Sequence, residues 1–205
     1  MLRTMLGVAV LAALLSTGCG RKDETPVAPA PPAAPAPAPA PVEPIASPVV
    51  DAAPPVTAST LLTPTMGNTA GGQITFTPED GAARLRGMLT GLAPDSVHGF
   101  HVHETGDCSA PDASSAGAHF NPDGQAHGNA LTDAPHHAGD IPNVTADAQG
   151  NATVDVVIRN VGVASGDTRD VVGKALVLHE KADDYTTQPS GDSGARIACG
   201  VISSP

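Results

Sequence analysis

The sequence predicts an all-β fold for the part of the chain that follows residue 55. Short segments there alternate apolar and polar residues, and turn residues such as Gly, Asn and Asp separate them. A period of two is typical of strands with one buried face. No stretch beyond residue 18 shows a convincing helical period. Strands joined by Gly-rich turns favour an antiparallel barrel or sandwich.

The alternating segments follow one another along the chain. Ile74 and Phe76 share one face of the segment 72–78, and Leu85 and Leu89 share one face of the next. Later faces are formed by Val154, Val156 and Ile158, and by Leu176 and Leu178 opposite Val177 and His179. The turn signals are Gly67-Asn68, Asp80-Gly81, Asp123-Gly124 and Gln149-Gly150. Each segment therefore offers an apolar face to a common core.

The first 18 residues have the features of a secretory signal peptide. Arg3 precedes an apolar run over residues 5–15, which is too short to span a membrane. Small residues then lead to Cys19, and the ending Leu-Ser-Thr-Gly-Cys resembles a bacterial lipobox, in which the Cys is lipidated. An ordinary cleaved signal is the alternative. We expect a bacterial cell-envelope protein on the periplasmic side, lipid-anchored to a membrane through Cys19.

The residues after Cys19 predict a tether. Residues 20–55 are Ala/Pro repeats with few large apolar side chains, so they cannot bury enough surface to order themselves. Extended, they reach on the order of 100 Å at about 3.1 Å per residue. The expected organisation is a signal peptide over 1–18, a lipidated Cys and disordered tether over 19–55, and one domain over 56–205.

Cysteine count and net charge narrow the possibilities further. If Cys19 carries lipid, Cys108 and Cys199 remain as a pair in an oxidising compartment. The net charge of −11 argues against nucleic acid and anionic membrane surfaces as partners. Any membrane contact is therefore expected through the lipid anchor alone.

Eight histidines, all between residues 98 and 179, predict a metal centre. His101 and His103 alternate along one expected strand, which puts both imidazoles on the same face, and His179 ends another strand. The intervening loop, rich in Gly, Pro, Asn and Asp, carries His119, His127, His136, His137 and Asp140. Metal coordination would organise so long a loop. Seven imidazoles and a carboxylate suffice for two metal ions, and imidazole suits copper and zinc.

Four motifs resemble the copper/zinc superoxide dismutase family, and most closely its exported bacterial branch. They are Gly99-Phe100-His101-Val102-His103, Gly117-Ala118-His119-Phe120-Asn121-Pro122, His137-Ala138-Gly139-Asp140 and Gly194-Ala195-Arg196-Ile197-Ala198-Cys199-Gly200-Val201-Ile202. The likeness runs from Val56 to Ile202 in the family's order. It implies a Greek-key antiparallel β-barrel or sandwich with long metal-binding loops.

The resemblance also implies two metals with a shared ligand. Copper would be bound by His101, His103, His119 and His179. Zinc would be bound by His119, His127, His137 and Asp140. We take His137 as the zinc ligand because it has the family's spacing to Asp140, and we expect its neighbour His136 to face solvent. His98 is expected to be a hydrogen-bonded structural histidine.

Three further roles follow from the resemblance. Asp183 would accept hydrogen bonds from His101 and His127 and so orient one ligand of each metal. Arg196 would draw superoxide to the open copper position, and His119 would release copper and carry a proton. Together they imply dismutation of superoxide to oxygen and hydrogen peroxide.

The residues leave two questions open. A tethered copper- and zinc-binding protein without turnover is the alternative function, and monomer and homodimer are equally compatible with the sequence. Residues 185–195 contain no Lys or Arg, so the source of electrostatic steering toward an anionic substrate is the weakest part of the functional prediction.

Overall fold

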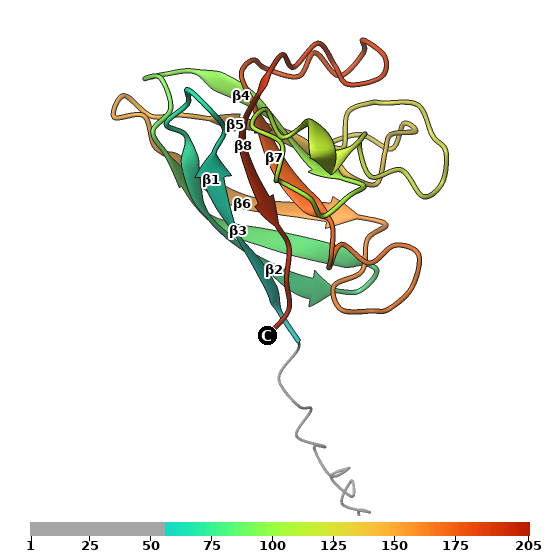
Figure 1. Ribbon diagram of the computed structural model, residues 1–205. Helices are drawn as coiled ribbons and strands as arrows, with labels where there is room; N and C mark the ends of the chain where they lie inside the picture. Colours follow the sequence, from blue (N-terminus) through green and yellow to red (C-terminus); the bar gives the residue numbers. More distant parts are fainter. Residues whose placement is uncertain (1–55) are drawn as a thin grey trace, which may run out of the picture. The chain divides into compact units, whose positions relative to one another are not determined.

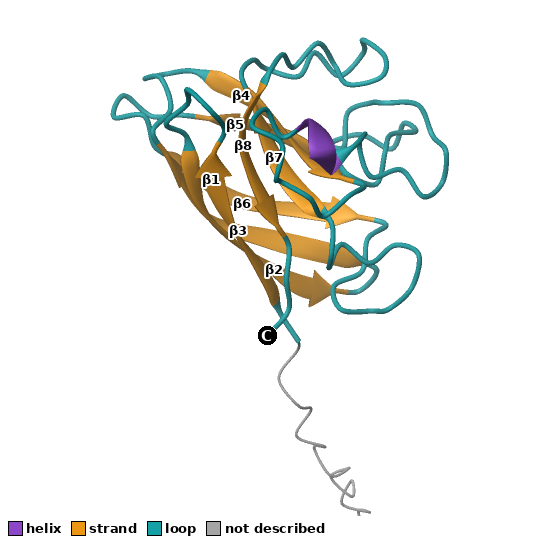
Figure 2. Ribbon diagram, viewed as in Figure 1, coloured by secondary structure: helices purple, strands orange, loops and turns teal. Residues whose placement is uncertain are grey.

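A computed structural model describes residues 56–205, and it consists almost entirely of antiparallel strands (Figures 1 and 2). The predicted signal peptide, lipidated Cys19 and tether lie outside the described residues. The strands are β1 (Ala58–Pro64), β2 (Gly71–Glu79), β3 (Ala82–Thr90), β4 (Val97–His103), β5 (Asp140–Thr145), β6 (Ala152–Arg159), β7 (Ala175–His179) and β8 (Arg196–Val201). Within this range one short 3₁₀ turn, η1 (Ser114–Ala116), is present, and no helix is long and apolar enough to cross a membrane. The predicted all-β fold is confirmed.

The eight strands form one sheet that curls into a nearly closed barrel. Their order is β5-β4-β7-β8-β1-β2-β3-β6, and the two edge strands β5 and β6 approach each other. The connections from β3 to β4 and from β6 to β7 pass over neighbouring strands, as in a Greek key. The turn signal Asp80-Gly81 joins β2 to β3 directly, and Gly81 adopts a positive φ of 65°, which glycine tolerates best.

The period-two pattern identifies the core correctly. Ile74, Phe76, Leu85 and Leu89 are all fully buried inside the barrel. Burial of each such side chain stabilises the fold by about 1.5–3 kcal/mol, which is why the alternation fixes which face of each strand turns inward.

Strand β7 is buried on both faces. Leu176 and Leu178 point into the barrel core, whereas Val177 belongs to a second, smaller cluster outside it. That second cluster also contains Ala113 and Ala116 from the long loop after β4. The outer face of the sheet is thus covered by loop residues in this region, and side chains on it can be buried without entering the barrel.

Strand β4 places the histidine pair on this covered outer face. Phe100 and Val102 point into the core, so His101 and His103 point outward between them. Residues 104–139 and 180–195, which follow β4 and β7, form the long loops on the right-hand and upper sides of Figure 1. Both imidazoles are almost fully buried, because these loops lie over them.

A disulfide fixes the first part of the loop after β4. Cys108 and Cys199 are bonded, with a sequence separation of 91 residues, and Cys108 packs against the smaller apolar cluster. Closing so long a loop stabilises the folded state by roughly 4–5 kcal/mol in the chain-entropy model. The predicted pair is confirmed, and it joins the segment before η1 to β8.

Candidate metal centre

The loops and strands bring the predicted ligands together as two groups of four donors. The first group is His101, His103, His119 and His179, and the second is His119, His127, His137 and Asp140. Within each group the ligand atoms lie within 4.8 Å of one another, and all seven residues are buried. His119 belongs to both groups, so its ring lies between them.

In His101 and His103, one ring nitrogen donates a hydrogen bond to an acceptor outside the first group, which leaves the other nitrogen free to face into the group. His103 Nδ1 donates to the carbonyl of Gly117 at 2.9 Å, and His101 Nε2 donates to Asp183 Oδ2 at 2.8 Å. A neutral imidazole carries one proton, so the other nitrogen of each ring presents a lone pair. His103 Nε2 and His179 Nε2 face each other at 3.3 Å.

The remaining nitrogens of this group show that a cation fits. His101 Nδ1 and His119 Nε2 are buried and have no hydrogen-bond partner among residues 56–205. Buried polar atoms normally have a partner, and unpaired ones cost free energy. Burial and the neighbouring His119 hold the pKa of His103 far below its usual range, so the ring stays neutral and able to bind a metal. Several imidazole lone pairs that converge without a donor form the environment a copper ion requires.

The second group is built around the carboxylate of Asp140. Its Oδ1 accepts from His119 Nδ1 at 2.9 Å and from His127 Nδ1 at 3.0 Å, and His137 Nδ1 lies 3.3 Å away. Its Oδ2 accepts from the backbone N–H of Gly128 and of His137. Three imidazoles and one carboxylate match a closed tetrahedral zinc site.

Backbone pairing holds His119 in its place between the groups. His119 forms an isolated antiparallel bridge with His103, and the N–H of Phe120 donates to the carbonyl of Val102. This part of the loop thus pairs with the end of β4. As a result, Nδ1 of His119 faces Asp140 and its Nε2 faces the first group.

Asp183 connects the two groups by accepting a hydrogen bond from one histidine of each. Its Oδ2 accepts from His101 and its Oδ1 accepts from His127 Nε2 at 2.9 Å. Burial opposes ionisation of Asp183, but these hydrogen bonds outweigh it and hold the pKa of the carboxyl below its usual range. Asn143 on β5 fixes the backbone of Asp183 through two hydrogen bonds. The contacts are those expected from the resemblance.

Three loop residues contribute to the centre without having been identified from the sequence. Gln188 donates to the His127 carbonyl and accepts from the His127 N–H, both at 2.9 Å. Gly191 has a φ of +67° and passes directly over Asp183, and Ser193 contacts His179. Among these, Gly191 carried a sequence signal, since glycine in a loop often marks positive φ or a close approach.

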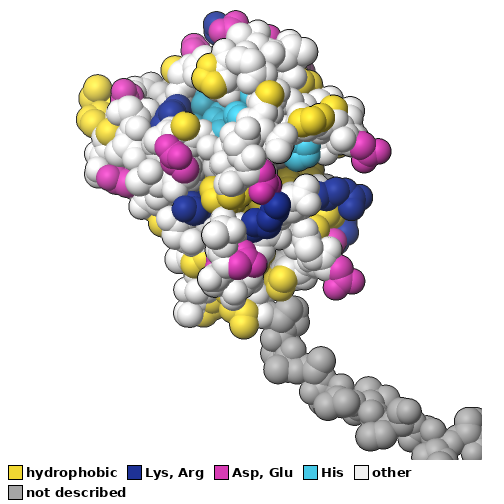
Figure 3. All heavy atoms as spheres, turned by 90° about the vertical axis from the view of Figure 1, so that its right-hand side faces the viewer, with side chains coloured by type: hydrophobic (Ala, Val, Ile, Leu, Met, Phe, Trp, Pro, Cys, Tyr) yellow, Lys and Arg dark blue, Asp and Glu magenta, His cyan; other side chains and the backbone are white. Residues whose placement is uncertain are grey.

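Arg196, at the start of β8, lines the pocket that opens onto the first group. Its guanidinium donates to the carbonyls of Ala113 and Gly117, both at 2.6 Å. The pocket has a volume of about 770 Å³ and is also lined by His103, Glu104, His119, Asn121 and His179. Arg196 is the only Lys or Arg among its described lining residues. Histidine atoms are visible between the surrounding side chains on the face in Figure 3.

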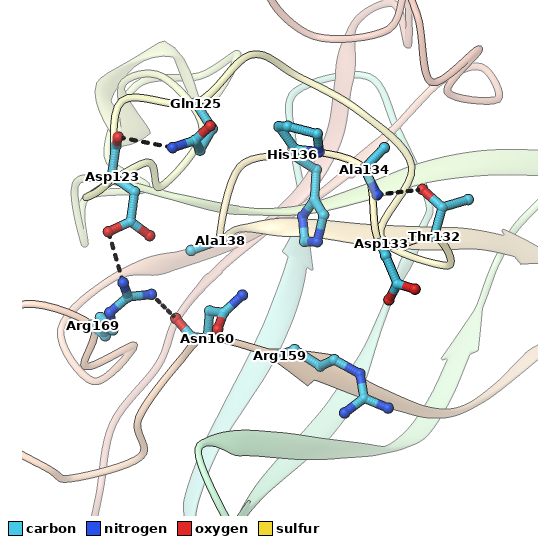
Figure 4. A pocket seen from close by; sticks show the side chains of 11 residues that line it. Asp123, Gln125, Thr132, Asp133, Ala134, His136, Ala138, Arg159, Asn160 and Arg169 are labelled. Carbon is cyan, nitrogen blue, oxygen red and sulfur yellow. Dashed lines mark hydrogen bonds and ion pairs between the residues drawn. The ribbon is translucent and has the colours of Figure 1, made fainter.

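The two remaining histidines, His136 and His98, lie outside both groups. His136 points into a different pocket, lined also by Arg159 and Arg169 (Figure 4), and its Nδ1 donates to the carbonyl of His137. In the same pocket an ion pair of 2.8 Å joins Arg169 to Asp123 of the histidine loop. His98 Nδ1 donates to the carbonyl of His179 at 2.7 Å.

Replacement of Gly191 by Ala is predicted to weaken metal retention in the second group. A Cβ at Gly191 would overlap Asp183 Oδ1 and lie 2.8 Å from His127 Nε2, so the carboxylate must move away from the ring. Loss of such an orienting contact costs roughly 10–100-fold in metal affinity. Competition with a chelator would measure zinc affinity.

Gly166→Ala is the matched control for this experiment. Gly166 has a similar φ of +70°, but nothing lies within 4 Å of an added Cβ. Both variants therefore carry the backbone strain, and only Gly191→Ala carries the overlap. Equal zinc affinities for the two variants would show that the close approach to Asp183 has no role.

The metal-free protein is predicted to be most stable near pH 6.5. Burial lowers the pKa of His127, but hydrogen bonds to Asp140 and Asp183 outweigh burial and raise this pKa to about 9. The stabilisation that protonated His127 gives to the folded state is fully present below its pKa in the unfolded chain, about 6.5. It is lost as the pH rises through about 9. Burial lowers the pKa of His119 to about 4, so stability is also lost as the pH falls below about 6.5. Urea midpoints at about pH 5, 6.5 and 9.5 measure both effects; a midpoint that rises above pH 6.5 would contradict the assignment to His127.

Comparison with known proteins agrees with this geometry. The family model described as copper/zinc superoxide dismutase matches residues 70–202. "Superoxide dismutase [Cu-Zn] 2" of Aquifex aeolicus is 44% identical over 115 residues, which are 55% of this chain and 67% of that protein. "Superoxide dismutase [Cu-Zn]" of Caulobacter vibrioides is 38% identical over 135 residues, covering 64% and 77%.

Two further relatives carry other names. "Superoxide dismutase-like protein YojM" of Bacillus subtilis is 42% identical over 116 residues, covering 54% of this chain and 58% of that protein. The crystal structure of the clock protein EA4 has a TM-score of 0.64 at 39% identity and covers 74% of this chain and 96% of that one. Copper and zinc are the metals of the matched family, and the two donor groups fit them. The chain belongs to the copper/zinc superoxide dismutase family.

Proposed function

We propose that this protein dismutates superoxide to oxygen and hydrogen peroxide at a copper ion that shares a histidine with a structural zinc. The observation that carries the proposal is the pair of four-donor groups with His119 in common, beside a pocket that contains Arg196. Copper, when bound, supplies a centre that alternately accepts and donates one electron. The family membership supports the same activity.

The ligand assignment follows the donor groups. We assign copper to His101, His103, His119 and His179, and zinc to His119, His127, His137 and Asp140. The zinc ligands include the carboxylate of Asp140, whose Oδ2 is also fixed by two backbone N–H groups, as suits a rigid structural site. Three of the four copper ligands, His103, His119 and His179, line the open pocket, as suits a site that exchanges substrate.

Two side chains take part in the reaction beyond metal binding. The guanidinium of Arg196 attracts superoxide and donates hydrogen bonds to it, since it is the cation of the pocket. Formation of peroxide consumes two protons. Nε2 of His119 is buried and has no hydrogen-bond partner among residues 56–205, so it is an atom that can hold one of them.

Electrostatic attraction must act locally in this protein, since the chain as a whole carries a charge of −11. Residues 185–195, which border the pocket through Pro189, Ser190 and Gly194, contain no Lys or Arg. Arg196 is therefore expected to supply most of the attraction that the protein part provides.

Arg196→Ala is predicted to lower the dismutation rate about tenfold at low ionic strength while leaving copper and zinc content unchanged. The difference should shrink as salt is added, because salt screens the attraction. Arg86→Ala is the matched control: it removes the same charge from an exposed side chain on β3, distant in the sheet order from β8. Equal rates for both variants at matched copper loading would remove Arg196 from the mechanism.

A copper- and zinc-binding protein without turnover is the second candidate function. One relative is named only superoxide dismutase-like, at 42% identity. The two functions are distinguished by the turnover of residues 56–205 with copper and zinc quantified on the same sample. Turnover proportional to copper supports the enzyme, whereas full copper loading with negligible turnover supports the binding protein.

We further propose that the chain is exported to the periplasmic side of the bacterial envelope and lipid-anchored through Cys19. The signal-like residues 1–18 support this proposal, and the Cys108–Cys199 disulfide suits an oxidising compartment. The full chain is expected in the membrane fraction and its Cys19→Ser variant in the periplasmic soluble fraction. Equal distribution of both forms would exclude the anchor.

A further inference from the structure

Ser193 is a buried hydroxyl that the proposed mechanism does not use. It lies in the loop 180–195, and only 2% of its surface is exposed. Its Oγ lies 3.1 Å from Nδ1 of His179 and 3.0 Å from the carbonyl oxygen of Ser190. A buried serine with two polar neighbours, one of them a donor of the first group, is a candidate for orienting that donor.

The hydrogen positions at this contact follow from counting donors. A hydroxyl has one proton, and the Ser190 carbonyl can only accept, so Ser193 donates to Ser190. Ser193 Oγ is then an acceptor toward His179. The carbonyl of Gly194, 3.3 Å from the same Nδ1, is also an acceptor. Two acceptors around Nδ1 require the proton of His179 to be on Nδ1, which leaves a lone pair on Nε2.

We propose that Ser193 is a positioning residue that fixes the tautomer and the ring orientation of His179, so that Nε2 faces the copper position. The inference rests on the proposed function, because it takes His179 as a copper ligand. Ser193 is the nearer of the two acceptors, and the Gly194 carbonyl alone would hold the ring less firmly. Ser193 thereby does for His179 what the Gly117 carbonyl does for His103.

The surrounding packing holds Ser193 close to β4. A Cβ at Gly99 would lie 2.8 Å from the Cβ of Ser193 and 3.2 Å from Cε1 of His101. The absence of a side chain at Gly99 therefore leaves room for Ser193 directly over β4. The loop 180–195 then orients two donors of the first group, His101 through Asp183 and His179 through Ser193.

The test compares Ser193→Ala with Thr186→Ala in the full domain. Thr186 is exposed in the same loop, and its hydroxyl makes none of the hydrogen bonds that hold the centre. In zinc-loaded, copper-free protein, ¹⁵N NMR of the histidine rings reports the tautomer of His179. We expect a protonated Nδ1 in the wild type and in Thr186→Ala, and a mixture of tautomers in Ser193→Ala. Copper(II) affinity, measured by chelator competition, is expected to fall about tenfold in Ser193→Ala alone.

The copper(II) EPR spectrum adds a readout that mere loss of packing would not change. Altered hyperfine coupling is expected in Ser193→Ala, and Ser193→Thr, which keeps the hydroxyl, is expected to restore the wild-type spectrum. If Ser193→Ala does not retain zinc, Ser193→Gly provides the same deletion of the hydroxyl. An unchanged tautomer, affinity and spectrum in the variants that lack the hydroxyl would overturn the proposal.

A separate variant distinguishes this failure from failure of the proposed function. If His179→Ala keeps the wild-type copper spectrum, His179 is not a ligand and the copper assignment itself is wrong. If His179→Ala loses that spectrum while Ser193→Ala keeps it, the assignment stands and Ser193 alone is excluded.

Discussion

The centre depends on one constraint of imidazole chemistry: each ring has two nitrogens, and only one of them carries the proton when the ring is neutral. A histidine becomes a reliable metal ligand when its other nitrogen has an acceptor of its own. In this protein those acceptors are the Gly117 carbonyl for His103 and the Asp183 carboxylate for His101 and His127. They come from loops, whereas His101 and His103 come from a strand. Metal binding therefore requires both long loops to be correctly positioned relative to the barrel.

The histidine loop, residues 104–139, is fastened to the barrel and to two other loops by contacts that differ in kind. The disulfide between Cys108 and Cys199 holds the start of the histidine loop covalently. Gln188 holds the middle of that loop through the backbone of His127, and the ion pair from Arg169 holds its outer side. None of these residues contributes a donor to either group. Their effect is to keep a segment with little regular secondary structure in one conformation, which a binding site with fixed geometry needs.

The sequence predicted the barrel and the composition of the centre because both leave periodic or motif-like signals. Alternation of apolar and polar residues identifies the inward faces of β2, β3 and β7. The same alternation in His101-Val102-His103 puts both histidines on one face of β4. The roles of Gln188 and Ser193 could not be predicted in this way. Their contacts depend on where the loop 180–195 lies in space, and loop geometry is set by tertiary hydrogen bonds that leave no period in the sequence.

A single carbonyl oxygen has an unusual position in this arrangement. The oxygen of Gly117 accepts from His103 Nδ1 and also from the guanidinium of Arg196. Gly117 has a φ of +76°, and an added Cβ would lie 2.8 Å from Glu104 Oε1, so the peptide has little freedom to take another side chain. The pocket cation Arg196 and the His103 ring of the first donor group are thus held by the same atom. A displacement of this one carbonyl would therefore shift both side chains together.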